Sequence, residues 1–283
     1  MNILISTNDL YYSAAKTMLT SLCENNKFEN HSIYLLYSNL GENKVKELKQ
    51  FLARYGATFH QIRVREEDFI EFPTGYHFTI EIYYRLLVQS VMPESVNRIL
   101  WLDADMIVKS SLENFYYQDF EGKCISVCQS INQDPTPLIE KLELPKSTIY
   151  FNSGIILFNL ELMRKTVDER IYIDYIQNNS DKLTWPDQDA LNVIFQDRKK
   201  INDYQIYNMQ HFHDTTFSLE MKGFIDQNTV VLHYIGSTKP WNYRFCNYTL
   251  KYYRRYASMH ESILMRLRFN ILHLLYRIKK SFR

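Results

Sequence analysis

The sequence predicts an α/β protein with a mixed, mainly parallel sheet flanked by helices, because strand-like runs alternate with helical patterns from the first residues onward. Runs of strand length lie at 3–7, 32–37, 58–64 and 98–102, and helical patterns lie at 13–24, 42–54 and 80–91. The continuous apolar run Ile99–Leu102 is typical of a strand buried on both faces. This alternation predicts a Rossmann-like, nucleotide-binding arrangement of βαβ units.

Length and charge predict how the chain is organised. Its 283 residues, 46% of them hydrophobic, fit one large domain with an appendage, which we place at residues 1–250 and 251–283. Residues 251–283 hold nine Lys or Arg and one Glu, a net charge of +8, while the whole chain carries +1. One basic end on an otherwise acidic chain predicts a partner for that end.

The cellular compartment follows from weaker signals. The four cysteines lack the spacing of a zinc site and are interpreted as buried thiols, which predicts a reducing, cytoplasmic compartment. The N-terminus has the pattern of a first strand, and we do not expect a signal peptide. No stretch approaches 18 uncharged apolar residues, so we expect no membrane span.

Ligands of such sheets bind where loops leave the carboxyl ends of the strands. Three such places carry polar residues: Ser6–Asp9, Asp103–Asp105, and the run from His233 to Trp241. We expect these three places to meet in one cleft.

A divalent-metal site is predicted at the second and third of these places. Asp103 and Asp105 point the same way in extended chain, and two adjacent carboxylates repel each other unless a cation binds them. With His233 they form a set that suits Mn²⁺ best, with Mg²⁺ as the alternative, and that disfavours zinc. The competing interpretation is that Asp-x-Asp is an ordinary turn.

An anion site is predicted beside the metal. Gly236 allows close approach of the backbone to a phosphate, and Lys239 places an ammonium group next to it. The alternative is a strand end followed by a turn that Pro240 fixes.

Two further runs carry polar side chains. Asn152 and Ser153 precede the apolar run Ile155–Phe158, where a sugar could lie against the backbone. Asp187, Gln188 and Asp189 open a helical pattern, where acids also serve as plain capping residues. The pair His211 and His213 is expected in a loop, at the surface or lining an acceptor pocket rather than binding metal.

In this order the motifs resemble those of the retaining glycosyltransferases of family eight, which include bacterial lipopolysaccharide glucosyl- and galactosyltransferases and glycogenin. The resemblance runs from residue 1 to about residue 245 and implies a fold of the GT-A type. It rests on the strand-one loop, Arg85 in a helix, Asp-x-Asp at 103–105, Phe-Asn-Ser-Gly at 151–154, Asp-Gln-Asp at 187–189 and His-x-x-Gly-x-x-Lys-Pro-Trp at 233–241.

The resemblance also implies roles for individual residues. Thr7 and Asp9 would contact the uridine of a UDP-sugar with Asn8 nearby, Arg85 would reach the donor sugar or its phosphate, and Ala104 would offer backbone to the sugar–ribose side. Asp103, Asp105 and His233 would bind Mn²⁺. Asn152 and Ser153 would border the donor hexose, Asp187 would bind its hydroxyls, Gln188 would lie under the anomeric carbon, and Gly236 and Lys239 would hold the diphosphate. One departure is Gln129, which stands where relatives of the bacterial type often have an acid.

A mechanism follows from these roles. The leaving UDP gains negative charge, which a divalent cation and Lys239 would stabilise. Because Gln188 is a poor nucleophile, we favour front-face return, in which the leaving phosphate deprotonates the acceptor hydroxyl on the same side. Double displacement through Asp187 is the alternative.

The basic tail has the pattern of an amphipathic helix. Apolar residues recur at helical spacing over residues 263–282 with Arg and Lys among them. We expect peripheral attachment to an anionic membrane surface on its inner face, which suits a lipid-linked acceptor. The alternative is a helix packed on the main domain. No nucleic-acid recognition motif accompanies the charge, and we expect no nucleic-acid partner.

The predicted function is therefore Mn²⁺-dependent transfer of a hexose from UDP-galactose or UDP-glucose to a glycan or lipid-linked oligosaccharide. Self- or protein-glucosylation of the glycogenin type is the second hypothesis. A non-catalytic glycan- or nucleotide-binding module is the third.

Overall fold

The computed structural model describes residues 1–27, 31–65, 67, 80–131 and 134–281. The chain divides into two compact units. Unit 1 comprises Met1–Asp9, Phe28–Asp103 and Glu113–Asp203, and unit 2 comprises Leu10–Lys27, Ala104–Leu112 and Tyr204–Arg283. This division differs from a boundary at residue 250, because residues 251–283 share a unit with residues 204–250. The predicted two-domain boundary stays a prediction.

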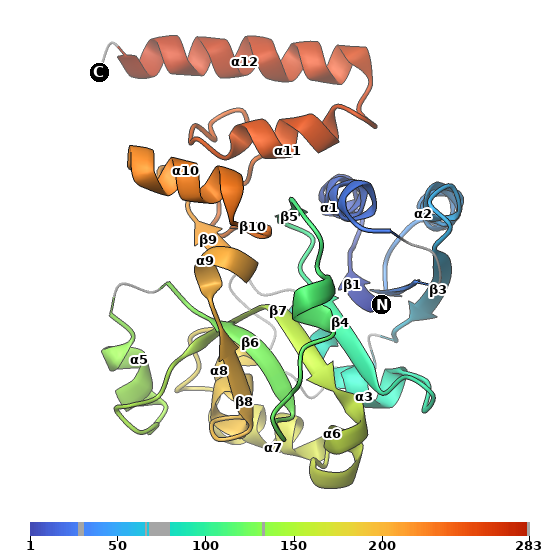
Figure 1. Ribbon diagram of the computed structural model, residues 1–283, viewed down its shortest axis with the longest axis vertical. Helices are drawn as coiled ribbons and strands as arrows, with labels where there is room; N and C mark the ends of the chain where they lie inside the picture. Colours follow the sequence, from blue (N-terminus) through green and yellow to red (C-terminus); the bar gives the residue numbers. More distant parts are fainter. Residues whose placement is uncertain (28–30, 66, 68–79, 132–133, 282–283) are drawn as a thin grey trace. The chain divides into compact units, whose positions relative to one another are not determined.

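Unit 1 contains a seven-stranded sheet in the order β3-β2-β1-β4-β7-β6-β8 (Figure 1). Its strands are β1 (Asn2–Ser6), β2 (Ser32–Tyr37), β3 (Thr58–Arg63), β4 (Arg98–Leu102), β6 (Ile125–Gln129), β7 (Phe151–Asn159) and β8 (Lys199–Asn202). Neighbouring strands are parallel from β3 through β4, β7 runs antiparallel to both β4 and β6, and β8 is parallel to β6. The sheet is therefore mixed and mainly parallel, as the alternation of elements predicted.

The central strands of the sheet are apolar and are buried on both faces. Ile3, Leu4 and Ile5 of β1 are fully buried, as is the run Ile99–Leu102 of β4. A strand buried on both faces gains from a continuous apolar run rather than from alternation. Trp101 and Phe158 are among the largest fully buried side chains of this core.

The helices of unit 1 follow or connect these strands. They are α2 (Glu42–Ala53), the 3-10 helix η2 (Ile80–Leu87), α3 (Val88–Val91), α4 (Glu113–Tyr116), α5 (Thr136–Lys141), α6 (Leu160–Thr166), α7 (Arg170–Asn178) and α8 (Pro186–Ile194). Pro186 stands at the first turn of α8, where its fixed φ suits helix initiation and no N–H is needed. The side chain of Asn159 caps α6 by accepting from the N–H of Leu162.

Unit 2 contains a three-stranded sheet in the order β5-β10-β9. Its elements are α1 (Tyr12–Asn25), β5 (Met106–Val108), α9 (Tyr204–Tyr207), β9 (Met209–His211), α10 (Leu219–Gln227), β10 (Val231–Tyr234), α11 (Leu250–Ala257) and α12 (Ile263–Ser281). Helix α1 packs against β5 and α11. The core of this unit is aromatic, with Tyr234, Phe245, Tyr253 and Tyr256 buried together.

Helix α12 lies alongside α11 and keeps one face in solvent (Figure 1). Arg254 of α11 forms two hydrogen bonds with Glu261 and stacks on Phe269, with its guanidinium carbon 4.2 Å from the ring centroid. Within the described ranges, none of the helices combines the length and the apolar content that a membrane crossing requires.

Several predicted elements differ from those observed. Asn152 and Ser153 were expected before a strand, but β7 begins at Phe151 and includes both. His233 was expected after a strand and lies inside β10. The helical pattern at 80–91 forms a 3-10 helix followed by one α-turn, a difference that hydrophobic spacing alone does not resolve.

Candidate active site

In unit 1 the predicted site residues gather at one edge of the sheet. Strands β1 and β4 are parallel and pair Ile5 with Leu102, so the residues that follow them leave the sheet at the same edge. Because β7 is antiparallel to β4, its beginning lies at that edge too, and the carbonyl of Gly154 accepts from the N–H of Asp103 at 2.9 Å. Strand order therefore places Thr7, Asp103 and the start of β7 together.

Arg85 connects three of these segments. From η2, its Nη2 lies 2.9 Å from Oδ1 of Asp103 and its Nε lies 3.2 Å from Oδ2 of Asp187. Its Nη1 donates to the carbonyl oxygen of Ser153. The guanidinium also stacks on Trp101, 4.8 Å from the ring centroid. A planar guanidinium has five N–H donors in a rigid fork, so it can contact two carboxylates and a carbonyl in one defined geometry, which a rotatable ammonium does not fix.

Asp103 is held through only one of its two carboxylate oxygens. Oδ1 accepts from Arg85 and, at 2.8 Å, from Nε1 of Trp101. Among the residues that the structure describes, no group donates to Oδ2. The carboxylate is thus oriented by the protein and retains an oxygen that can bind a cation.

Asp187 lies in the first turn of α8 and is buried. The hydroxyl of Ser153 donates to its Oδ2 at 3.1 Å. Burial raises the pKa of Asp187 to about 6; the charge of Arg85 opposes this shift, and the charge of Asp103 adds to it. A carboxylate with such a pKa is ionised near neutral pH but protonates under mild acid.

Gln188 is fixed by hydrogen bonds at both ends of its amide. Oε1 accepts from Nδ2 of Asn152 at 3.0 Å and from the backbone N–H of Ser153 at 2.9 Å. Nε2 donates to the hydroxyl of Tyr150 at 3.1 Å. The structure therefore brings together Arg85, Asp103, Asn152, Ser153, Asp187 and Gln188, six of the predicted site residues.

Asp189 has a structural role, as the capping interpretation predicted. Its Oδ2 accepts from the backbone N–H of Thr184 at 2.6 Å and of Trp185 at 2.9 Å. Its Oδ1 accepts from the hydroxyl of Tyr150. The residue thus secures the start of α8 and, through Tyr150, the position of Gln188.

The residues after β1 are placed at the same edge but have other partners. Thr7 is buried, and Nδ2 of Asn8 donates to Glu81 at 2.9 Å. Asp9 is exposed, and its Oδ1 pairs with Nζ of Lys44 at 2.8 Å. The hydrogen bond from Lys44 lowers the pKa of Asp9. The uridine contacts of Thr7, Asn8 and Asp9 and the backbone role of Ala104 stay predictions.

In unit 2, strand register brings Asp105 to His233. Strand β10 is antiparallel to β5 and pairs His233 with Met106, so the residue before β5 meets the end of β10. Oδ1 of Asp105 lies 3.3 Å from Nε2 of His233, and Oδ2 lies 2.6 Å from Nζ of Lys239. Burial alone would raise the pKa of Asp105, but Lys239 and His233 offset it and hold the pKa far below its usual range.

Asn208 is a polar neighbour of His233 that the sequence did not reveal. It is fully buried just before β9, and its Oδ1 lies 3.0 Å from Nδ1 of His233. An amide oxygen only accepts, so Nδ1 of His233 carries a proton, and Nε2 is the ring nitrogen that faces Asp105. Ligand histidines are commonly oriented in this way by a partner on the other ring nitrogen. A lone Asn in a turn carries no sequence signal for this role.

Position 236 requires a glycine for two reasons, its backbone conformation and the closeness of Phe212. Its φ is +84°, and a Cβ at this position would lie 2.8 Å from a ring carbon of Phe212. Lys239 is held close by through a hydrogen bond to the carbonyl of Tyr234 at 2.8 Å. Backbone conformation and packing are sufficient to explain a glycine at position 236, and its contact with a diphosphate stays a prediction.

The expectation for His211 was wrong. It is fully buried in β9, with Nδ1 3.0 Å from the carbonyl of Met209 and Nε2 2.7 Å from Oγ1 of Thr249. Burial lowers its pKa to about 4, so the ring is neutral. Tyr234 and Phe245 surround it, and His211 is part of the core of unit 2 rather than an acceptor pocket.

Comparison with known proteins identifies the family. The sequence profile of "Glycosyl transferase family 8" matches residues 2–244. The chain is 28% identical over 248 residues to the lipopolysaccharide 1,2-glucosyltransferase of Escherichia coli, covering 85% of this chain and 73% of that protein. It is also 28% identical over 181 residues to the lipopolysaccharide 1,3-galactosyltransferase of Salmonella typhimurium, covering 60% and 52%.

A solved structure agrees in fold. The galactosyltransferase LgtC, crystallised with donor and acceptor sugar analogs, matches with a TM-score of 0.80 at 20% identity, covering 93% of this chain and 97% of that one. At this identity the likeness concerns the fold alone, and it confirms the predicted GT-A type. With a family profile that matches nearly the whole chain, this protein belongs to glycosyl transferase family 8 and is a glycosyltransferase.

Proposed function

We propose that this enzyme transfers a hexose from UDP-galactose or UDP-glucose to a glycan or lipid-linked oligosaccharide, with retention of configuration and with Mn²⁺ as cofactor. The observation that carries the proposal is the environment of Asp105, between the imidazole of His233 and the ammonium of Lys239. A mostly buried carboxylate with an imidazole on one side and an ammonium on the other suits a bound metal next to a leaving diphosphate. Mg²⁺ is the alternative metal.

Asp103, Asp105 and His233 fit a divalent cation by the chemistry of their donor atoms. Only Ala104 separates the two aspartates, so their Cα atoms are at most about 7 Å apart whatever the chain conformation. Oδ2 of Asp103 and Nε2 of His233 are the atoms that the hydrogen bonds above leave for a ligand. Two carboxylates and one imidazole suit Mn²⁺ in oxygen-rich coordination. A bound divalent cation would supply Lewis-acid stabilisation to the phosphate oxygens of the donor.

Lys239 would stabilise the charge of the departing nucleotide. Its ammonium is fixed by the carbonyl of Tyr234 and by Asp105, so it needs little reorganisation to meet a second anionic oxygen. Gly236, three residues before Lys239, has no side chain and would let the backbone approach the diphosphate closely.

On the sugar side, Arg85 and Ser153 hold the carboxylate of Asp187, which would accept hydrogen bonds from donor hydroxyls. Gln188 would lie under the anomeric carbon. An amide whose oxygen already accepts two hydrogen bonds is a poor nucleophile, and this supports front-face return over double displacement. In this scheme the leaving phosphate takes the proton of the acceptor hydroxyl.

The test is hydrolysis of a panel of UDP-sugars by the full chain with Mn²⁺, with Mg²⁺ and with chelator. We expect hydrolysis of UDP-galactose or UDP-glucose that needs the metal. Asp105→Ala should lower it by at least about 100-fold. Asp226→Ala is the matched control, because Asp226 is a half-exposed aspartate of the same unit that pairs with Lys251. Metal-independent hydrolysis, or equal loss in both variants, would contradict the proposal.

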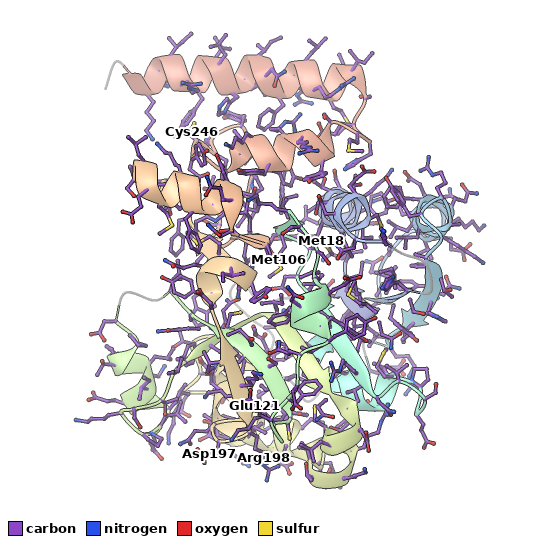
Figure 2. All side chains as sticks on the ribbon, viewed as in Figure 1. Met18, Met106, Glu121, Asp197, Arg198 and Cys246 are labelled. Carbon is purple, nitrogen blue, oxygen red and sulfur yellow. The ribbon has the colours of Figure 1, made fainter. Side chains whose placement is uncertain are left out.

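We further propose that the tail binds an anionic membrane surface through α12 alone, because Tyr253 and Tyr256 of α11 are buried in the core. On α12, five residues spaced by three and four positions form what we call the outer stripe: Leu264, Leu267, Ile271, Leu274 and Ile278. They are between 46% and 76% exposed, and Figure 2 shows side chains of α12 projecting away from α11. Cations flank an apolar stripe in helices that lie on membranes.

The membrane proposal is tested by flotation with anionic vesicles. Leu267→Glu combined with Ile271→Glu should abolish recovery, because it places two charges in the outer stripe. Asn270→Glu adds one charge at the border of the outer stripe, beside Leu267 and Leu274, and should lower the recovery less than the double variant. Equal recovery of the double variant and the unchanged chain would remove the membrane hypothesis. A cytoplasmic location on the inner face of the membrane stays a prediction.

A further inference from the structure

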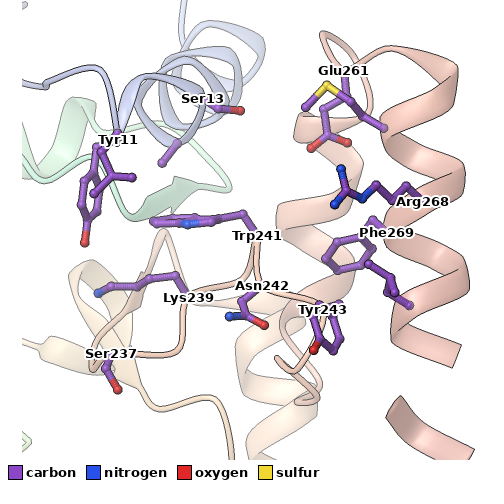
Figure 3. Close-up of a pocket in the computed structure, with 14 residues that line it drawn as sticks. Tyr11, Ser13, Ser237, Lys239, Trp241, Asn242, Tyr243, Glu261, Arg268 and Phe269 are labelled. Carbon is purple, nitrogen blue, oxygen red and sulfur yellow. The ribbon is translucent and has the colours of Figure 1, made fainter. Parts of the chain in front are cut away.

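Unit 2 contains a cavity of about 570 Å³ along the inner side of α12 (Figure 3). Its walls come from the start of α1, from residues 237–243 and from α12. Lys239 lies at one part of its wall and Arg268 at another. The volume falls within the usual range for small-molecule sites. Since Lys239 also contacts Asp105, one end of the cavity adjoins the candidate diphosphate site.

Four aromatic side chains line the wall, those of Tyr11, Trp241, Tyr243 and Phe269, and two of them present polar atoms toward a ligand. Trp241 lies between the start of α1 and Phe269 of α12, and Tyr243 lies next to Phe269 (Figure 3). Among the described residues, neither Nε1 of Trp241 nor the hydroxyl of Tyr243 has a hydrogen-bond partner. Aromatic faces with free donors at their edges suit a sugar ring, whose C–H face packs on the ring while its hydroxyls pair.

The cavity also presents one cation without a partner. Glu261 lines the wall, but Arg254 neutralises it through two hydrogen bonds of 3.1 and 2.7 Å. Lys239 is paired with Asp105. In the described part of the chain, no hydrogen bond or ion pair involves the guanidinium of Arg268. An unpaired guanidinium in the wall of a cavity suits a phosphate or carboxylate.

Arg268 borders both the cavity and the outer stripe. On a helix, residues three and four apart are neighbours. Arg268 therefore adjoins Leu264 and Ile271 of the outer stripe on one side, and Met265 and Leu272 of the cavity wall on the other. If the outer stripe lies in a membrane, a cation at this position lies at the level of the lipid headgroups.

We propose that this cavity binds an anionic sugar in the headgroup of a membrane glycolipid, with the sugar ring against Trp241 and Tyr243 and its phosphate or carboxylate on Arg268. The lipid part stays in the bilayer beside the outer stripe. This inference rests on the proposed function, since the bound headgroup is the acceptor, brought to the end of the cavity that adjoins Lys239.

The first experiment measures binding of glucose 6-phosphate, glucose and inorganic phosphate to the full chain by tryptophan fluorescence, without donor. We expect glucose 6-phosphate to bind about tenfold more tightly than either fragment. Arg268→Gln should lose this advantage, and Arg277→Gln, an exposed cation of α12 outside the cavity wall, should keep it. Trp241→Phe should lose the fluorescence change that Trp185→Phe keeps. Equal binding by Arg268→Gln and Arg277→Gln would overturn the site.

The second experiment separates a lipid headgroup from a soluble sugar phosphate. Flotation is compared for phosphatidylglycerol vesicles with and without lipid A, a phosphorylated disaccharide lipid. On vesicles of phosphatidylglycerol alone, the recovery of Arg268→Gln and of Arg277→Gln should fall by the same amount. Lipid A should raise the recovery of the unchanged chain and of Arg277→Gln, but not that of Arg268→Gln. Binding of glucose 6-phosphate without any effect of lipid A overturns the lipid assignment.

UDP-sugar hydrolysis by the unchanged chain, measured in parallel, tells the two proposals apart. If hydrolysis depends on the metal but Arg268→Gln binds the sugar phosphate unchanged, this inference is wrong and the proposed function stands. If binding depends on Arg268 but no UDP-sugar is hydrolysed, the proposed function is wrong and the binding site stands.

Discussion

The side-chain oxygen of Asn208 accepts a hydrogen bond from Nδ1 of His233 at 3.0 Å, which leaves Nε2 of the ring directed at Asp105, 3.3 Å away. Both Asn208 and His233 are buried, so water does not compete for the hydrogen bond between them. The imidazole is therefore oriented for a ligand before any ligand binds.

Asn208→Ala should weaken metal binding while the protein stays folded. Loss of an orienting partner of a ligand histidine typically costs about 10–100-fold in metal affinity. We expect the Mn²⁺ concentration for half-maximal UDP-sugar hydrolysis to rise by that factor. Asn202→Ala is the control, because Asn202 makes similar polar contacts, to Ser126 and Val127, away from His233. An unchanged Mn²⁺ requirement in Asn208→Ala would refute the orienting role.

Protonation of Asp187 should determine how kcat/KM falls at acidic pH. Its pKa is raised to about 6 by burial, against the pull of Arg85. Below pH 6 the carboxyl becomes neutral and loses its charge for Arg85 and its acceptor capacity for sugar hydroxyls. We expect kcat/KM to fall about tenfold per pH unit below 6 and to be flat above it. In Asp187→Asn the fall of kcat/KM below pH 6 should disappear, and activity at pH 7.5 should be about 100-fold lower. Asp181 is exposed, and Asp181→Asn should keep the pH dependence of the unchanged chain.

No hexose should become attached to the enzyme. Gln188 uses its amide oxygen on Asn152 and Ser153, and Asp187 is held by Arg85 and Ser153. We expect the intact mass to stay unchanged after incubation with UDP-glucose or UDP-galactose, for the unchanged chain and for slow Gln188→Ala. A hexose increment mapped to Asp187 would establish double displacement. An increment on a Tyr would favour self-glucosylation of the glycogenin type.

His211 should make the fold sensitive to acid. Its pKa is lowered to about 4 by burial, while an unfolded chain has the ordinary value of 6.5. The unfolded state thus gains a proton first as the pH falls, and stability present above pH 6.5 is lost toward pH 4, by up to about 3 kcal/mol.

The urea midpoint at pH 7 and pH 4.5 measures this effect. His211→Phe should be less stable at pH 7, because Met209 and Thr249 lose a partner, but should lose less on acidification. His213→Gln, at a half-exposed ring, should follow the unchanged chain. If His211→Phe loses as much stability between the two pH values as the unchanged chain, the buried ring does not carry the effect.

The sequence predicted the sheet and several partners in the site because both follow from short-range patterns. Ile99–Leu102 is buried on both faces, as a continuous apolar run implies, and Asp103 must follow it at the edge of the sheet. Asp187 and Gln188 open a helix at Pro186, as Pro and acids at a helix start predict. His211 was misplaced, because a polar ring between aromatic residues carries no sign of its burial.

Chain order and residue type by themselves determined the α/β class, the strand ends that carry acids, and the amphipathic pattern of residues 263–281. Tertiary structure decided which polar atoms remain for a ligand. Antiparallel pairing of β7 with β4 brings Ser153 to Arg85, and pairing of β10 with β5 brings His233 to Asp105. Strand register and burial set such distances between residues remote in sequence, and local pattern contains no information about them.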